Sequence, residues 1–222
     1  MSSHLASLLR DMGFSVTTQQ VGDTKGRNNI FAEREGKSTG IMFYGHIDTV
    51  NLVNPDQWQT DPYEAVAKSG RIYGLGSGDM KGGLSCFISA ASQSQVAIKI
   101  FLAVDEENWS EGAWTALKNN PKFFKDVNLV ISAEPGFGLD TNQITVGRTG
   151  RILYEVSFAG RPTHIINYRD AIDAIELAGI FLNLFYSSRN RIFASPDSIG
   201  QARRIAGEAV GMSVCGHSEV EM

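Results

Sequence analysis

The sequence predicts an α/β protein in which a mostly parallel sheet is flanked by helices. Apolar spacing typical of helices alternates with short apolar runs typical of strands throughout residues 1–135. Residues 97–104 form a nearly continuous apolar run, which is typical of a strand buried on both faces, and residues 129–133 form another. Together these observations indicate a central sheet with helices on both sides.

Hydrophobic spacing and turn residues define the individual elements. Leu5, Leu8, Leu9 and Met12 recur at helical spacing, and Gly13 ends that helix. The other elements expected over this part of the chain are strands at 14–18, 29–34, 41–44, 97–104 and 129–133, helices at 84–91 and 110–117, and a long polar surface loop at 51–70.

The pattern changes after about residue 140. Residues 144–146 and 152–158 alternate as antiparallel strands do, and a long helix with a broad apolar face follows at 171–185. The signal is weak beyond residue 189. We therefore expect two domains, residues 1–145 and residues 146–222.

Composition excludes several classes of protein. The 222 residues are 42% hydrophobic and 20% charged, which is ordinary globular usage. A net charge of −4 without a basic stripe argues against nucleic acid as a partner. No apolar run approaches the ~20 residues that span a bilayer, and no signal peptide is evident. Cys86 and Cys215 form no disulfide framework, so we expect a cytoplasmic protein without a membrane partner.

One histidine and several carboxylates fall at or just beyond predicted strand ends: His46 with Asp48, Asp79, Glu106 with Glu107, and Glu134. His46 and Asp48 point to the same side of an extended segment, so Asp48 is placed to orient a metal-binding imidazole. The carboxyl ends of strands form the ligand crevice of an open α/β sheet. The recurrence of these side chains therefore predicts a metal site.

Each segment alone also has a simpler interpretation. His46 is consistent with a surface histidine beside an aspartate, and residues 105–107 are consistent with a solvated turn. A bound cation would relieve the repulsion among the three adjacent acids. The glycines at 74, 76 and 78 could suggest a phosphate loop, but they do not follow the G-x-G-x-x-G spacing, and Asp79 would repel phosphate.

The order and spacing of six motifs resemble the M20 family of zinc-dependent peptidases and deacylases, which includes acetylornithine deacetylase and succinyl-diaminopimelate desuccinylase. The motifs are GHIDTV at 45–50, GSGDMKGG at 76–83, VDEE at 104–107, AEPG at 133–136, GRTG at 147–150 and GRPTH at 160–164. The resemblance runs from about residue 5 to about residue 186. It implies a zinc-exopeptidase-like catalytic domain at 1–145 and the start of a small α+β lid or dimerisation domain at 146–222.

The resemblance also implies a role for each site residue. His46 and Glu134 would bind the first zinc ion, and Asp48 would orient His46. Asp79 would bridge both ions, and Glu107 would bind the second. Glu106 would be the general base in cleavage of an amide bond of an N-acyl amino acid or small peptide. The cofactor would be two zinc ions, with cobalt or manganese as substitutes.

Two further residues are assigned through the same resemblance. His164 matches a family histidine that lies in the lid domain of one subunit and helps to stabilise the oxyanion in the active site of the other subunit. The resemblance therefore implies a homodimer through the lid domain. A loop histidine without a catalytic role is the alternative. Arg148 would bind a substrate carboxylate, although a surface role is equally favoured.

The chain is shorter than family members, whose polypeptide returns after the lid and supplies a last histidine to the second zinc ion. His217 is the only late candidate, and its sequence context does not match. We therefore expect a chain truncated at its C-terminus, in which the second zinc ion binds more weakly, so that one ion or none is the alternative to two. We also expect a tail that lacks the lid's strands from residue 195, which would expose apolar surface of the helix at 170–186. The alternative function is a catalytically impaired fragment or homologue that binds a partner.

Overall fold

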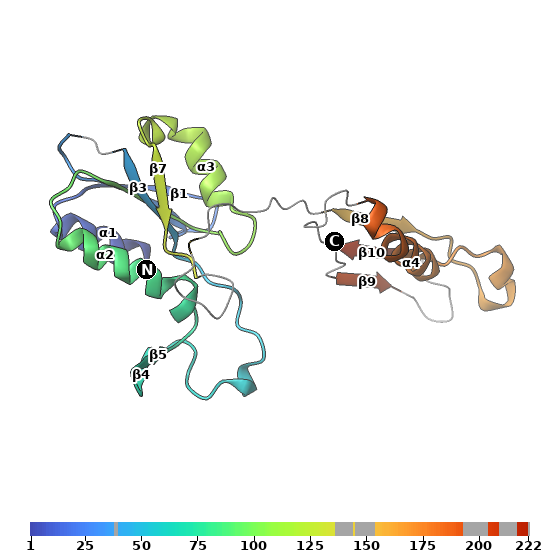
Figure 1. The fold of residues 1–222 in the computed structure, drawn as a ribbon. Coiled ribbons are helices and arrows are strands. Elements are labelled where there is room, and N and C mark those ends of the chain that lie inside the picture. Colours follow the sequence, from blue (N-terminus) through green and yellow to red (C-terminus); the bar gives the residue numbers. More distant parts are fainter. Residues whose placement is uncertain (38–39, 136–143, 145–153, 193–203, 209–216, 222) are drawn as a thin grey trace. The chain divides into compact units, whose positions relative to one another are not determined.

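The computed structural model describes residues 1–37, 40–135, 144, 154–192, 204–208 and 217–221. The chain forms two compact units, Met1–Thr145 and Val146–Met222, and each contains its own sheet (Figure 1). The predicted α/β class is confirmed, because helices flank the central sheet of the first unit. None of the described helices has the length and apolarity needed to cross a membrane.

The first unit contains a five-stranded sheet with the order β1-β2-β6-β3-β7. In chain order its elements are α1 (Ser2–Asp11), β1 (Ser15–Gln20), β2 (Asn28–Glu33), β3 (Ile41–His46), η1 (Pro55–Gln57), β4 (Val66–Lys68), β5 (Arg71–Tyr73), η2 (Ser77–Gly82), α2 (Gly83–Ser92), β6 (Lys99–Ala103), α3 (Glu111–Asn119), η3 (Pro121–Phe124) and β7 (Leu129–Ser132).

The sheet is mixed, whereas the sequence predicts one that is mostly parallel. The strand β3 pairs in parallel with β6 and β7, but β2 pairs antiparallel with both β1 and β6. Apolar patterning shows which segments are strands but not the direction in which each meets its neighbour. The parallel half carries the candidate site, since the carboxyl ends of β6, β3 and β7 lie at one edge.

Alternating side chains of the central strands build a core on each face of this sheet. Ile30 of β2 and Ile100 of β6 belong to the core beneath α1 and α2, whereas Phe31 and Phe101 belong to the core beneath α3 and η3. Figure 1 shows α1 and α2 on one face and α3 on the other. The buried run at 97–104 is therefore confirmed as a strand covered on both faces.

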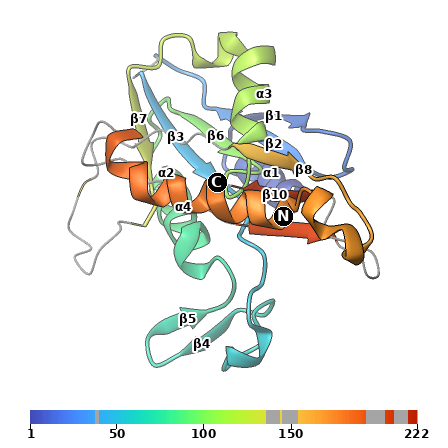
Figure 2. The same cartoon turned by 90° about the vertical axis from the view of Figure 1, so that its right-hand side faces the viewer.

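Two expectations for the first unit are wrong in part. Leu129, Val130 and Ile131 of β7 are 52%, 51% and 40% exposed, although the sequence predicts a buried strand. The strand lies at the edge of the sheet, and among the described residues only β3 pairs with it. The expected loop at 51–70 contains η1 and leads into the β4–β5 hairpin, which projects away from the main sheet (Figure 2).

The second unit contains a three-stranded antiparallel sheet with the order β8-β10-β9 and one long helix. Its elements are β8 (Glu155–Ala159), η4 (Ile165–Asp170), α4 (Ala174–Ile192), β9 (Arg204–Glu208) and β10 (His217–Glu221). Phe158 of β8 and Phe181 of α4 have ring centroids 5.5 Å apart, so the helix packs on the sheet. Residues 145–146 and 152–153 of the expected strands lie outside the described residues.

The expectation that the tail lacks strands is wrong, because β9 and β10 both lie beyond residue 195. Their sequences, RIAGE and HSEVE, contain few apolar residues, which explains the weak signal. The helix α4 still carries exposed apolar side chains, as expected, and they lie on more than one side of it. Ile175, Ile180 and Leu184 are 51%, 51% and 59% exposed.

Candidate metal centre

The parallel strands bring most of the predicted site residues to one edge of the first sheet. The strand β3 ends at His46, and Glu106, Glu107 and Glu134 follow the ends of β6 and β7 within a few residues. The expectation that Asp79 lies at a strand end is wrong, because it lies in the irregular turn η2, which directly precedes α2. Segments far apart in the sequence therefore meet because parallel strand ends share an edge.

The imidazole of His46 is the centre of this group. Its Nε2 atom lies 3.0 Å from Oδ1 of Asp79 and 3.7 Å from Oε1 of Glu134. Two sets of potential ligands share this histidine, and within each set the ligand atoms lie within 4.8 Å of one another. The two sets are His46 with Glu106 and Glu134, and His46 with Asp79 and Glu107.

Contacts on the other side of the ring fix its orientation. His46 is fully buried, and its backbone N–H donates to Sδ of Met80 at 3.1 Å. Its Nδ1 atom lies 3.1 Å from the backbone oxygen and 3.6 Å from Oδ1 of Asp48. The backbone N–H of Glu107 donates to Oδ2 of Asp48 at 3.1 Å. Asp48 thus contacts Nδ1, while Nε2 faces the carboxylates.

The protonation of His46 and Asp48 reflects this environment. Burial alone would lower the pKa of His46, but hydrogen bonds with Asp48 and Asp79 and the charge of Glu134 outweigh it and raise the pKa to about 9. Burial would raise the pKa of Asp48, yet hydrogen bonds from His46 and backbone N–H groups lower it. Without metal, the site therefore stabilises an imidazolium among carboxylates.

The donor set fits a divalent metal ion. Burial raises the pKa of Glu107, and the negative charge of Asp79 raises it further. A cation among these groups would reverse that effect, because it favours the ionised carboxylates. One imidazole with several carboxylate oxygens is a ligand set that zinc accepts in catalytic sites.

A close backbone approach places Glu134. Gly83 begins α2, and a Cβ atom at this position would lie 2.0 Å from the backbone oxygen of Ala133, the residue before Glu134. Only glycine permits this contact without displacement of the chain. The glycine at the start of α2 therefore lets the chain that leads to Glu134 pass close to the segment that carries Asp79.

Three residues beside the centre were missed by reasoning from the sequence. Met80 accepts the N–H of His46, and Arg27 forms an ion pair with Asp105, with Nη2 2.6 Å from Oδ1. Met80 stands in the motif GSGDMKGG, but nothing in the sequence assigns it a contact with His46, and no pattern marks Arg27. Asp105 had a signal, since three adjacent acids cannot all face one site without repulsion, and its side chain contacts Arg27 instead.

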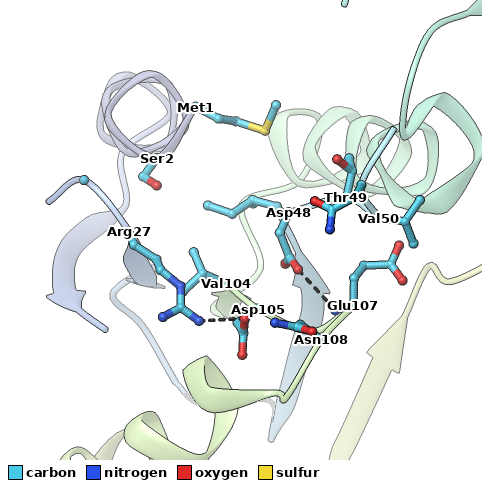
Figure 3. Close-up of a pocket in the computed structure, with 13 residues that line it drawn as sticks. Met1, Ser2, Arg27, Asp48, Thr49, Val50, Val104, Asp105, Glu107 and Asn108 are labelled. Carbon is cyan, nitrogen blue, oxygen red and sulfur yellow. Dashed lines mark hydrogen bonds and ion pairs between the residues drawn. The ribbon is translucent and has the colours of Figure 1, made fainter. Parts of the chain in front are cut away.

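A cavity of about 420 Å³ opens beside the centre (Figure 3). Asp48 and Glu107 line it together with Arg27, Asn51 and the start of α1. The close-up shows Asp48 bonded to the backbone at Glu107, and Arg27 bonded to Asp105. The cavity provides room for a ligand next to the carboxylate of Glu107.

The remaining candidates belong to the second unit or lie outside the described residues. His164 lies in the second unit, where it precedes η4, and its Nδ1 accepts the backbone N–H of Ile166 at 3.3 Å. Arg148 lies outside the described residues. The backbone of His217 pairs with Ala159 and Glu208 in the second sheet, so this residue belongs to β10 of that unit.

Comparison with known protein families gives a match over most of the chain. A model of peptidase family M20/M25/M40 matches residues 42–218. Succinyl-diaminopimelate desuccinylase of Rickettsia bellii is 27% identical in an alignment 172 residues long, and the match covers 73% of this chain and 44% of that protein. Acetylornithine deacetylase of Proteus mirabilis is 29% identical in an alignment 196 residues long, and the match covers 85% of this chain and 48% of that protein. The chain thus spans about half the length of these curated relatives.

Solved structures share the fold at lower identity. The M20 family metallo-carboxypeptidase Sso-CP2 from Sulfolobus solfataricus has a TM-score of 0.68 and 17% identity, covering 99% of this chain and 64% of that chain. Human carnosine dipeptidase 1 has a TM-score of 0.62 and 17% identity, covering 100% of this chain and 62% of that chain. At this level of identity the similarity establishes the fold.

Proposed function

Because the chain belongs to peptidase family M20/M25/M40, we propose that it is a metal-dependent hydrolase that cleaves the amide bond of an N-acyl amino acid or a small peptide. The observation that carries this proposal is the pair of ligand sets that share His46. The relatives support the substrate class, since one is named a desuccinylase and another a deacetylase of amino acids.

The proposed metal is zinc, with two ions in the complete site and cobalt or manganese as substitutes. The proposed ligands are His46, Asp79, Glu107 and Glu134, which come from β3, η2 and the ends of β6 and β7. When bound, zinc supplies a Lewis acid that polarises the amide carbonyl and lowers the pKa of a water molecule. Asp48 would keep the imidazole in the orientation in which Nε2 faces the metal.

Glu106 is the proposed general base. Its carboxylate forms one group with the imidazole of His46 and the carboxylate of Glu134, with ligand atoms within 4.8 Å of one another. If the carboxylates of Asp79, Glu107 and Glu134 bind metal, the carboxylate of Glu106 is the one in this group that can accept a proton. It would take that proton from the attacking water and deliver it to the leaving amine.

The second unit is proposed to contribute His164 and a dimer contact. The Nδ1 atom of His164 accepts a hydrogen bond from the backbone, so in the neutral ring Nε2 carries the proton and is a donor. Such a donor stabilises the oxyanion that develops in amide hydrolysis. A homodimer through residues 146–222 would present it to a second copy. Binding of a substrate carboxylate by Arg148 and a cytoplasmic location stay predictions.

The test is a zinc titration of the purified full chain, followed by hydrolysis assays with a panel of N-acetyl amino acids, N-succinyl amino acids and dipeptides. We expect zinc binding in the wild type and in Glu106→Gln, with hydrolysis lower by at least about 100-fold in the variant. Glu35→Gln, the same change at an exposed site, is the control. A folded chain that binds zinc but hydrolyses no substrate in the panel would contradict the hydrolase and favour an impaired homologue.

A further inference from the structure

The turn that connects β6 to α3 carries Glu106 and Glu107, and an unusual residue begins it. Asp105 has a φ of 66°, in the left-handed region of backbone conformation that residues other than glycine rarely adopt. The residue is also 9% exposed, so its carboxylate is buried. Such a conformation persists where surrounding contacts hold it in place.

The contacts that hold Asp105 use every oxygen of the residue. Its Oδ1 atom lies 2.6 Å from Nη2 of Arg27, and its Oδ2 atom accepts the backbone N–H groups of Trp109 and Glu111 at 3.2 and 3.1 Å. Its backbone oxygen accepts the N–H of Ser110 at 2.6 Å. Asp105 therefore connects the beginning of the turn to residues 109–111 at its end, and its ion pair connects the turn to Arg27.

Both sides of this turn are also fixed to β2. The Oδ1 atom of the fully buried Asn29 accepts the N–H of Val104 at 3.1 Å, and its Nδ2 atom donates to the backbone oxygen of Gly112 at 2.8 Å. A Cβ atom at Gly112 would lie 2.2 Å from the backbone oxygen of Val104. The start of α3 thus packs directly against the end of β6.

Arg27 connects the turn to a different part of the unit. Its backbone oxygen accepts the N–H of Val21 at 2.8 Å, which anchors the residue in the loop between β1 and β2. Its Nη1 atom donates to Oε2 of the half-exposed Glu111 at 2.7 Å. Hydrogen bonds with Glu111 and the charges of both carboxylates raise the pKa of Arg27 against the opposing effect of burial, so the cation is permanent.

We propose that Asp105, held by Arg27, is a positioning residue that directs the carboxylates of Glu106 and Glu107 toward the metal centre. Asp105 turns away to Arg27, and the following two residues project toward His46. The N–H of Glu107 then reaches Asp48, which links the turn to the imidazole. This inference rests on the proposed metal-dependent function, because it assigns the means by which two of its residues are oriented.

The test compares zinc affinity among folded variants of the full chain. Asp105→Asn keeps the size and tolerates the left-handed backbone, but it removes the charge that pairs with Arg27. Glu111→Gln makes the same chemical change on the other carboxylate that contacts Arg27, at a position away from the metal, and is the matched control. Arg27→Met removes the cation, and Arg27→Lys restores it without the fork geometry.

We expect Asp105→Asn and Arg27→Met to weaken zinc binding by about 10- to 100-fold, as loss of groups that orient ligands does elsewhere. Arg27→Lys should recover part of that loss, and Glu111→Gln should stay within about twofold of wild type, since exposed ion pairs contribute little. Chelator competition measures affinity. The absorption spectrum of the cobalt-substituted chain should also change in Asp105→Asn, which a purely structural role would not produce.

Urea unfolding of each metal-free variant shows whether that variant is folded. If Arg27→Met does not fold, zinc affinity in Asp105→Asn and Arg27→Lys tests the positioning role instead. If folded Asp105→Asn binds zinc with wild-type affinity and its cobalt spectrum is unaltered, the positioning role is wrong but the proposed function stands. This holds even if the variant is less stable than the wild type. A folded wild-type chain that binds neither zinc nor cobalt would overturn the proposed function and this inference with it.

Discussion

Replacing Gly83 with alanine tests how closely the start of α2 packs against the strand that leads to Glu134. The added Cβ atom would lie 2.0 Å from the backbone oxygen of Ala133, whereas ordinary contacts begin at 3.4 Å. The chain must therefore shift by about 1.4 Å, the difference between these two distances. Metal–ligand distances tolerate only about 0.2 Å, so Glu134 would leave coordination range.

We expect Gly83→Ala to lower the free energy of unfolding by about 1–3 kcal/mol, the usual cost of overpacking. We also expect zinc binding at least about tenfold weaker than in the wild type. Urea unfolding of the metal-free chain and zinc titration against a chelator measure the two effects separately.

Gly78→Ala is the matched control for this experiment. It lies in the same glycine-rich segment, beside Asp79, but a Cβ atom there would have no neighbour within 4 Å. Its effect on stability should stay below about 0.5 kcal/mol. Equal stability and equal zinc affinity in the two variants would refute the argument from close packing.

Other regions of the chain give further predictions. Arg34 is buried, donates to three backbone carbonyls and lies 4.1 Å from the ring centroid of Phe14, so Arg34→Met should cost about 2–4 kcal/mol in urea unfolding. A Cβ atom at Gly179 in α4 would have no neighbour within 4 Å, so Gly179→Ala should raise the free energy of unfolding by about 0.5–1 kcal/mol in the same measurement. A lower free energy of unfolding would show that the site is not open. The pKa of His46 is about 9 in the metal-free chain, above its ordinary value of 6.5, so its stabilising contribution is complete below pH 6.5 and lost as the pH rises through 9. The urea midpoint of the metal-free chain should fall over that range, and an equal fall in His46→Asn would show that another group is responsible.

The fold could be predicted from the sequence where hydrophobic pattern and burial agree. The apolar run at 97–104 marks β6 because this strand is covered on both faces by α1, α2 and α3. The same reasoning fails for β7, which is equally apolar but lies at the edge of the sheet. Strand neighbours and strand direction arise from tertiary pairing, and for that reason the mixed sheet could not be read from the sequence.

Most of the candidate site was predictable because His46, Glu106, Glu107 and Glu134 follow strands that are parallel neighbours, whereas Asp79 comes from η2. His46 and Glu134 could be placed on one edge from this rule alone. The contact of Asp48 with His46 was predicted as well. The contacts made by Met80 and Arg27 were not, because no sequence signal assigns either residue a contact beside the site. Met80 is an ordinary apolar residue in the sequence, and Arg27 lies in a loop far from Asp105, yet each contacts a group beside the centre.

Anomalous diffraction at the zinc edge from crystals of the zinc-loaded chain would locate the metal relative to His46. We expect a metal peak about 2.0–2.2 Å from Nε2 of His46, with carboxylate oxygens of Asp79 or Glu134 at similar distances. A zinc peak bound elsewhere, with Nε2 of His46 still hydrogen-bonded to Asp79, would contradict it.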